Sequence, residues 1–109
     1  MTEGGASSNG RIKATSFLPG KLDKHYDDHA ADFDEHLTPK QYEERARKFF
    51  DKPVTKDILW FEDVDGVLYK YDKVKKEFGM CTPQGAIITY FIPDDGLKYW
   101  QKQVEKYAI

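Results

Sequence analysis

The change of hydrophobic period at position 58 constrains the fold more than any other feature of the sequence. From there to position 92, four short segments follow a strand-like pattern, and turn-forming residues separate them. Short turns join antiparallel neighbours, because parallel strands need crossover connections of about a dozen or more residues. We therefore expect a four-stranded antiparallel β-meander. The predicted strands are Ile58–Glu62, Val67–Asp72, Glu77–Cys81 and Ala86–Ile92.

The last of these segments differs from the other three. Residues 86–92 are apolar on both alternating faces, which is typical of a strand that is covered on both sides. The pattern predicts that this strand is the central and most buried one. Thr89 places a hydroxyl group within it. That hydroxyl is either an ordinary part of a β-branched strand residue or a hydrogen-bond donor to a ligand.

Helical patterns flank the predicted sheet. In the first helix, roughly 21–33, an amphipathic stripe follows Leu22, Tyr26, His29 and Phe33. A third helix is expected over roughly 95–107, because its apolar residues recur at the spacing of one helix face. Those residues are Leu97, Trp100, Val104 and Tyr107.

The second helix has the clearest start and end signals. Thr38 suits the N-cap, Pro39 the first helical position, and Gln41 completes a capping box three residues after the cap. Pro53 ends the helix. The expected buried face consists of Tyr42, Ala46, Phe49 and Phe50.

The order of helices, strands and one further helix predicts an α+β domain, in which N-terminal helices pack on the four-stranded antiparallel meander and a C-terminal helix follows. We expect the helices to pack on one face of the sheet. The chain has 109 residues, which is enough for one domain with one modest core. We expect that domain at 17–109. Residues 1–16 begin with a Gly/Ser-rich stretch and are expected to be a flexible tail or linker.

Composition excludes several classes of protein. One cysteine, Cys81, cannot form an internal disulfide framework or a cysteine-rich zinc site. No apolar run approaches the roughly 20 residues that span a bilayer, so we expect no stable membrane association. The net charge of −2 indicates no overall preference for nucleic acid, although lysines are concentrated in residues 70–76 and acids in residues 21–36.

The candidate chemistry centres on His25 and His29, four residues apart in the first predicted helix. This spacing places both imidazoles on one helix face. Three interpretations stay open: a structural pair, a metal-binding fragment that lacks a recognisable third ligand, and an acid–base pair. In the last case Lys24 and Lys70 could supply positive charge, and Thr89 could donate a hydrogen bond to a phosphate.

An ordered series of short motifs resembles the C-terminal RNase toxin domains of bacterial polymorphic toxins, the group uniting barnase, EndoU, colicin E5, colicin D and RelE. His29–Phe33 is similar to the catalytic segment of colicin D. The resemblance covers about residues 17–103. It rests on His25–Phe33, Tyr42, Ala46, Phe49, Tyr71–Asp72, Glu77–Gly79, Gly85–Phe91, Pro93 and Tyr99–Gln101.

This resemblance implies a metal-independent endoribonuclease, without cofactor, that cleaves RNA by 2′-OH transesterification and often acts on tRNA. It implies delivery as part of a larger bacterial toxin, action in the target-cell cytoplasm, and neutralisation by a cognate immunity protein. By position, His29 corresponds to the core catalytic histidine, His25 to the histidine often found before it, and Thr89 to a threonine of the last strand.

The candidate site residues follow from both arguments. The catalytic candidates are His25, His29, Thr89 and Lys70, and the substrate-binding candidates are Lys21, Lys24, Tyr71 and Tyr90. The two tyrosines equally suit positions in the core.

Two positions depart from the family pattern. Asp28 stands where a lysine is usual, and Lys70 stands where an arginine is common. A carboxylate at position 28 would repel a phosphate backbone. Either Lys24 or Lys70 then supplies the cation, or the domain is weak, inactive or directed at something other than RNA. A non-catalytic interaction module on the same fold and a small metal-dependent enzyme therefore remain as alternatives.

Overall fold

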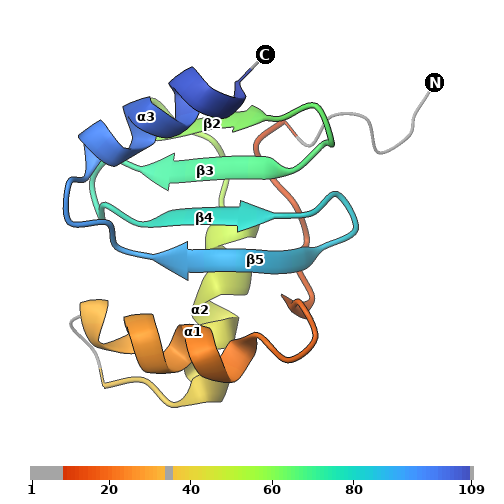
Figure 1. Ribbon diagram of the computed structural model, residues 1–109, viewed down its shortest axis with the longest axis vertical. Coiled ribbons are helices and arrows are strands. Elements are labelled where there is room, and N and C mark those ends of the chain that lie inside the picture. Colours follow the sequence, from red (N-terminus) through yellow and green to blue (C-terminus); the bar gives the residue numbers. More distant parts are fainter. Residues whose placement is uncertain (1–8, 34–35, 109) are drawn as a thin grey trace.

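The computed structural model describes residues 9–33 and 36–108. In this part of the chain, three α-helices and one 3₁₀ turn surround a sheet (Figure 1). The elements are β1 (Ser16–Phe17), α1 (Leu22–His29), the 3₁₀ turn Ala30–Asp32, α2 (Pro39–Asp51), β2 (Ile58–Glu62), β3 (Leu68–Asp72), β4 (Phe78–Cys81), β5 (Ala86–Phe91) and α3 (Leu97–Tyr107). The α+β class is confirmed, and the predicted elements appear with small shifts at their ends.

The sheet has five strands where the sequence predicted four. Its order is β1-β5-β4-β3-β2, and β2 to β5 form the expected antiparallel meander. The additional strand β1 pairs parallel to β5, with Phe17 opposite Ile87. Two residues are too few to show a hydrophobic period, so no sequence pattern predicts β1.

The capping signals of α2 are confirmed. The Thr38 hydroxyl accepts a hydrogen bond from the Gln41 backbone N–H, and the Gln41 side chain accepts one from the Thr38 N–H. The helix then lies across the sheet at Gly79 of β4, where an added Cβ would come within 2.5 Å of the Phe50 ring. Glycine at this position therefore lets α2 approach the sheet closely.

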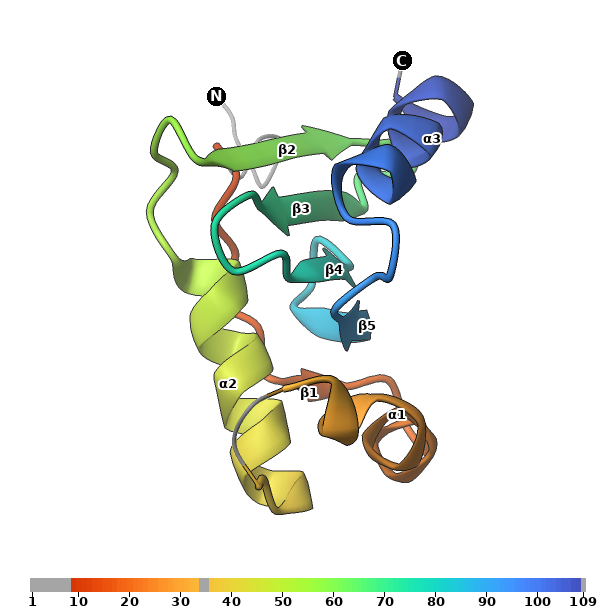
Figure 2. The same ribbon diagram turned by 90° about the vertical axis from the view of Figure 1, so that its left-hand side faces the viewer.

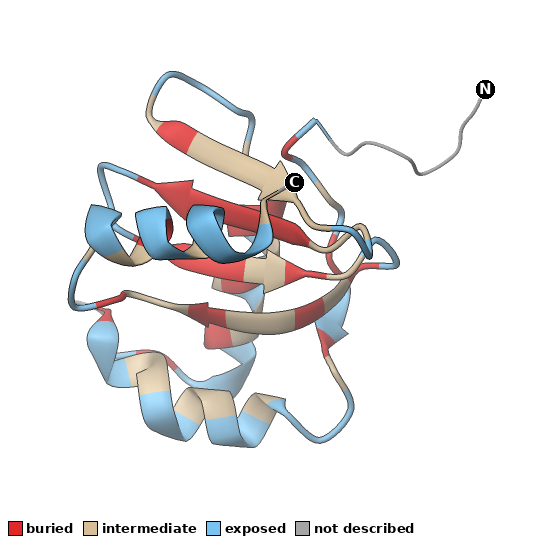
Figure 3. Ribbon diagram, turned by 45° about the horizontal axis from the view of Figure 1, so that its top comes forward, coloured by how far each residue is buried: buried red, intermediate tan, exposed pale blue. Residues whose placement is uncertain are grey.

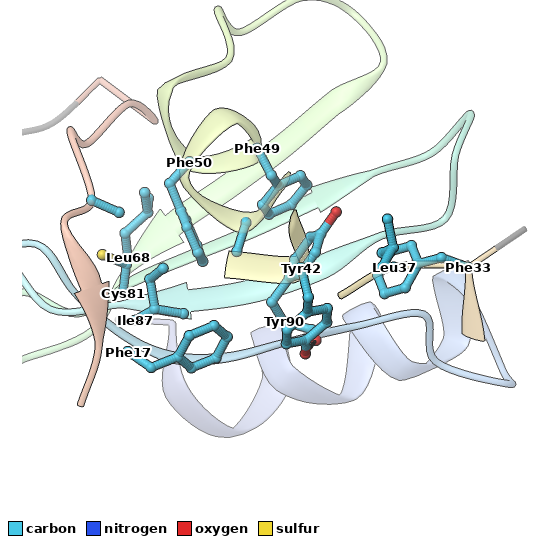
Figure 4. Packing of buried hydrophobic residues seen from close by; sticks show 12 residues of the cluster. Phe17, Phe33, Leu37, Tyr42, Phe49, Phe50, Leu68, Cys81, Ile87 and Tyr90 are labelled. Atoms are coloured by element: carbon cyan, nitrogen blue, oxygen red, sulfur yellow. Dashed lines mark hydrogen bonds between the residues drawn. The ribbon is translucent and has the colours of Figure 1, made fainter. Parts of the chain in front are cut away.

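Helices cover both faces of the sheet, which corrects the prediction that they pack on one face. Figure 2 shows α2 and α3 on opposite sides of the strands. The aromatic residues of α2 pack on one face (Figure 4), and Trp100 of α3 packs on the other, against Phe61, Tyr71 and Phe78. The alternating aromatic residues of β2 to β4 gave both faces an apolar surface, so both faces needed a cover.

An irregularity in β5 decides which side chains reach which face. Thr89 pairs with Met80, whereas Ile87 pairs with Cys81, so Ile88 is an extra residue of the β-bulge type. As a result Ile87 belongs to the α2-side core, while Thr89 shares its face with Met80, on the α3 side.

The most buried strand is β3, which corrects the prediction for residues 86–92. Every residue of β3 is buried, while four of the six residues of β5 are partly exposed. The sequence pattern did not predict the burial of β3, because Lys70 and Asp72 in this strand are charged. Buried charges of this kind persist when they are paired or hydrogen-bonded.

The folded unit also begins before position 17. The Ile12 N–H donates to the Phe50 carbonyl, and Ala14 is buried in the core. The part of the predicted tail from Ile12 onward is therefore part of the domain, and residues 1–8 lie outside the described residues. Within the described residues, no helix combines the length and apolarity needed to cross a membrane.

Candidate active site

The two histidines of α1 lie in one stack of aromatic rings. The ring centroids of Phe17 and His25 are 5.5 Å apart, those of His25 and His29 are 6.0 Å apart, and those of His29 and Phe91 are 4.8 Å apart. Phe17 comes from β1 and Phe91 from the end of β5. The structure therefore brings the two imidazoles together, as the spacing predicts, and holds them against the β1–β5 side of the sheet.

Asp32 holds His29 from the 3₁₀ turn that follows α1. Its Oδ2 lies 3.3 Å from His29 Nδ1 and accepts a hydrogen bond of 3.4 Å from the Ile92 backbone N–H. A carboxylate at Nδ1 orients an imidazole and leaves Nε2 for chemistry. Asp32 is not among the site residues that the sequence predicts. The signal that could have found it is the three-residue spacing from His29 in a helical segment.

His25 has a different environment. Its Nδ1 is buried and has no hydrogen-bond partner within the described residues. Burial of the ring, together with the nearby His29, lowers the pKa of His25 below its ordinary value of 6.5, against a smaller opposing effect of Asp28. His25 is therefore neutral at pH 7, which is the state that a general base requires.

Lys24 supplies a positive charge next to Asp28, the position where the family usually has a lysine. Its Nζ lies 3.1 Å from Asp28 Oδ2, one helical turn away. Both side chains are substantially exposed, so the pair contributes little to stability. Lys21 is exposed and precedes α1 at its N-cap position. Both lysines thus belong to the helix that carries the histidines, and both are accessible to solvent.

Thr89 lies on the same side of the sheet as Phe91, since the two residues are two positions apart in β5 after the irregularity. Phe91 stacks on His29. Thr89 is also partly exposed. The structure thus places Thr89 two residues before Phe91, the residue that contacts the histidine stack, on an accessible part of the sheet.

Lys70 does not lie with the histidines. It faces α2 and is fully buried, and its Nζ donates to the carbonyls of Phe50 (3.2 Å) and Lys52 (2.6 Å) at the end of that helix. Burial and the nearby Lys52 lower the pKa of Lys70 to about 8. We therefore remove Lys70 from the candidate site, because it closes the C-terminus of α2, where a cation complements the helix dipole.

The two tyrosines are core residues as well. Tyr90 is fully buried and donates to Glu77 Oε1 (2.7 Å), while Arg45 Nε donates to the Tyr90 hydroxyl (3.1 Å). Tyr71 is buried under Trp100, with ring centroids 6.1 Å apart. Neither side chain is accessible to a substrate in this structure.

None of the predicted site residues lines the three cavities described next to α1 and α2, although one of about 450 Å³ borders the helix of the histidines at Tyr26, Asp27 and Ala30. One of about 530 Å³ follows α2 and is lined by Lys40, Arg45 and Lys48, among others, with the third histidine, His36, at its end. It holds none of the predicted site residues. We prefer the histidine stack as the site, because among the described residues two imidazoles and a carboxylate meet there. In the described part of the chain, no three His, Cys, Asp or Glu side chains gather as metal ligands.

Comparison with known proteins finds a likeness in structure but none in sequence. No family model matches the sequence, and no curated protein is similar to it. Among solved structures, the chain is similar to a ribonuclease from Escherichia coli solved in complex with its inhibitor protein. The TM-score is 0.50 and the identity 17%, over 73% of this chain and 95% of that one. At this identity the likeness establishes a shared fold: the chain has the fold of a small bacterial ribonuclease.

Proposed function

We propose that this domain is a metal-independent endoribonuclease. The observation that carries the proposal is the pair of stacked imidazoles, one neutral and one held by a carboxylate. Internal transesterification of RNA requires one base and one acid, and two histidines of this kind can supply both. The shared fold with a solved ribonuclease supports the same assignment.

The geometry suggests a role for each group. His25 accepts the proton of the ribose 2′-OH, and the 2′ oxygen attacks the adjacent phosphorus. The bond from phosphorus to the 5′ oxygen breaks, and His29 gives that oxygen a proton, while the Asp32 carboxylate balances the charge of the protonated ring. The products are a 2′,3′-cyclic phosphate and a 5′-hydroxyl end. Thr89 and Lys24 are the candidate groups for binding the phosphate oxygens.

The direct test is cleavage of RNA by the purified domain in the presence of a chelator. We expect cyclic-phosphate ends from the wild type and a loss of at least about 10²-fold in rate for His29→Ala. His36→Ala is the matched control, because His36 is exposed and outside the stack. Intact RNA with the wild type, or equal rates for His29→Ala and wild type, would contradict the proposal.

The proposal extends to the biological role, the substrate and the partner of the domain. We propose that the domain is a toxin, delivered as part of a larger bacterial protein into the cytoplasm of a target cell, where tRNA is a candidate substrate. The solved ribonuclease is bound to its inhibitor protein, which supports a cognate immunity protein as the partner here. Expression in bacteria should arrest growth unless His29 is replaced. Sequencing of RNA ends from the arrested cells identifies the substrate.

One observation favours a second candidate, a non-catalytic interaction module. Within α1, Asp23, Asp27 and Asp28 outnumber the single cation Lys24. An acidic helix suits a basic protein partner better than a phosphate chain. A tight protein complex from pull-downs, with RNA left intact by the purified wild type, would select this alternative.

A further inference from the structure

The orientation of α3 is defined by its aromatic contacts. Trp100 and Tyr107 face the sheet, with Trp100 5.3 Å from the Phe61 ring and Tyr107 5.7 Å from the Tyr69 ring. Tyr99 lies on one flank of the helix, where its ring is 5.5 Å from that of Phe91. This flank therefore faces the part of the sheet that leads to the histidine stack.

Three lysines form a row that turns from this flank toward the outer side of α3. Lys98, Lys102 and Lys106 recur every four residues, about 6 Å apart along the helix axis. At about 100° per residue, Lys106 and Lys102 project within about 20° and 60° of the direction of Tyr99, and Lys98 about 100° from it. All three are exposed, and none forms an ion pair with another described residue. The outer surface of α3 is open to solvent (Figure 3).

Ring contacts lead from α3 to the histidine stack. Tyr99 contacts Phe91, and Phe91 in turn stacks on His29 at 4.8 Å. The surface between α1 and α3 is formed by β4 and β5 (Figures 1 and 2), including the partly exposed Met80 and Thr89. A chain held along α3 can therefore continue past Thr89 to the imidazoles.

The charges on the two helices are opposite. On α1 the acids predominate, whereas α3 carries three lysines and one acid, Glu105, which projects on the far side of the row from Tyr99. Asp94 and Asp95 precede α3, where acids complement the positive end of the helix dipole. A polyanion is therefore attracted to α3 and repelled by the outer face of α1.

We propose that the lysine row Lys98, Lys102 and Lys106 binds the phosphates of a single-stranded RNA whose scissile bond lies at the histidine pair. This inference rests on the proposed function and adds cations to Lys24 of α1, since Lys70 is buried in the core. Single-stranded RNA fits, because an unpaired backbone can follow a helix flank and its binding is governed by phosphate contacts.

The test measures binding without cleavage. The probe is a labelled single-stranded RNA whose 2′ oxygens are methylated, which removes the nucleophile, and binding is followed by fluorescence anisotropy over a range of salt. The variant is Lys98→Gln, Lys102→Gln, Lys106→Gln in one chain. Its matched control is Lys13→Gln, Lys40→Gln, Lys48→Gln, which removes the same charge from exposed lysines on the α2 side. Thermal melting confirms that both variants fold.

We expect the α3 variant to bind at least tenfold more weakly, with a slope of log affinity against log salt that is less steep by about 2, for three lost phosphate contacts. The control should bind within twofold of the wild type. Equal weakening by both variants, unchanged binding by the α3 variant, or no RNA binding by the wild type would overturn the inference.

Cleavage of unmodified RNA separates this inference from the proposed function. Tight, α3-dependent binding with no cleavage would support the lysine row and contradict the ribonuclease. Normal cleavage with unchanged KM in the α3 variant would support the ribonuclease and overturn the lysine row.

Discussion

At the scale of single residues, burial lowers the pKa of both His25 and Lys70. His25 loses the solvation of its charged form and faces a second imidazole, so its neutral form is favoured. Lys70 keeps its ammonium group in the core only by donating to two carbonyls at the end of α2. Burial thus favours the neutral form of His25, which the proposed base requires, and leaves Lys70 with a structural role.

The lowered pKa of His25 predicts the acid limb of the cleavage profile. A base must be neutral in the free enzyme, so kcat/KM should rise with pH through an apparent pKa below 6.5 and be level above it on this limb. The free energy of unfolding should also rise with pH over this range. As pH falls below 6.5, His25 binds a proton more readily in the unfolded chain than in the folded one, so the free energy of unfolding decreases. Rates and urea denaturation between pH 4.5 and 8 measure both effects. An apparent pKa at or above 6.5 would contradict this role for His25.

Lys70→Ala should destabilise the domain without affecting catalysis directly. The change leaves a cavity and removes the donor to the Phe50 and Lys52 carbonyls, so we expect a loss of about 2–4 kcal/mol in the free energy of unfolding. Urea denaturation measures this loss. RNA cleavage per folded molecule should stay at the wild-type level, and a stable variant without cleavage would return Lys70 to the active site.

The pKa of Lys70 gives a second signature of its burial. Because the folded value is about 8 and the ordinary value 10.5, the folded protein releases this proton first. Between these two values, the Lys70 contribution to the free energy of unfolding rises with pH, and below pH 8 it is constant. The Ala variant should lack this rise.

At the scale of elements, α2 and the sheet are fitted to each other at one glycine. The rings of Phe49 and Phe50 approach Gly79 so closely that a methyl group there would overlap both. The neighbouring strand contributes Lys70, which binds the C-terminus of the same helix. Close packing at Gly79 and hydrogen bonds from Lys70 thus both hold α2 on the sheet.

Gly79→Ala should therefore reduce stability although alanine has the better strand and helix propensities. Relieving the contact with Phe50 requires α2 to move or its rings to leave their rotamers, which costs about 1–3 kcal/mol. Thermal melting measures the change, and Phe50→Leu in the same chain should recover part of it. A variant as stable as the wild type would show that α2 does not rest on β4 in this way.

At the scale of the whole molecule, the sheet separates a structural side from the side that carries the candidate chemistry. The α2 face holds the larger core and the buried Lys70. On the other face, α3 covers the aromatic residues of β2 to β4 (Figure 1), and the histidine stack reaches β5 through Phe91. The acidic α1 and the basic α3 then border the same face, as the proposed path of the RNA requires.

The sequence by itself determined the features that depend on local periodicity. The period of two predicted the meander, the capping box predicted the start of α2, and the spacing of His25 and His29 predicted that they share a helix face. These features are encoded within one element, where the backbone repeat alone fixes which side chains are neighbours.

Only the tertiary structure decided the rest, because each remaining feature depends on contacts between distant segments. The irregularity in β5 placed Ile87 and Thr89 on opposite faces, and packing under α2 turned Lys70 from a candidate cation into a buried donor. Asp32 joined His29 through a turn that begins where α1 ends. A pattern of residue types cannot specify these outcomes, since strand register and helix placement are set by the whole core.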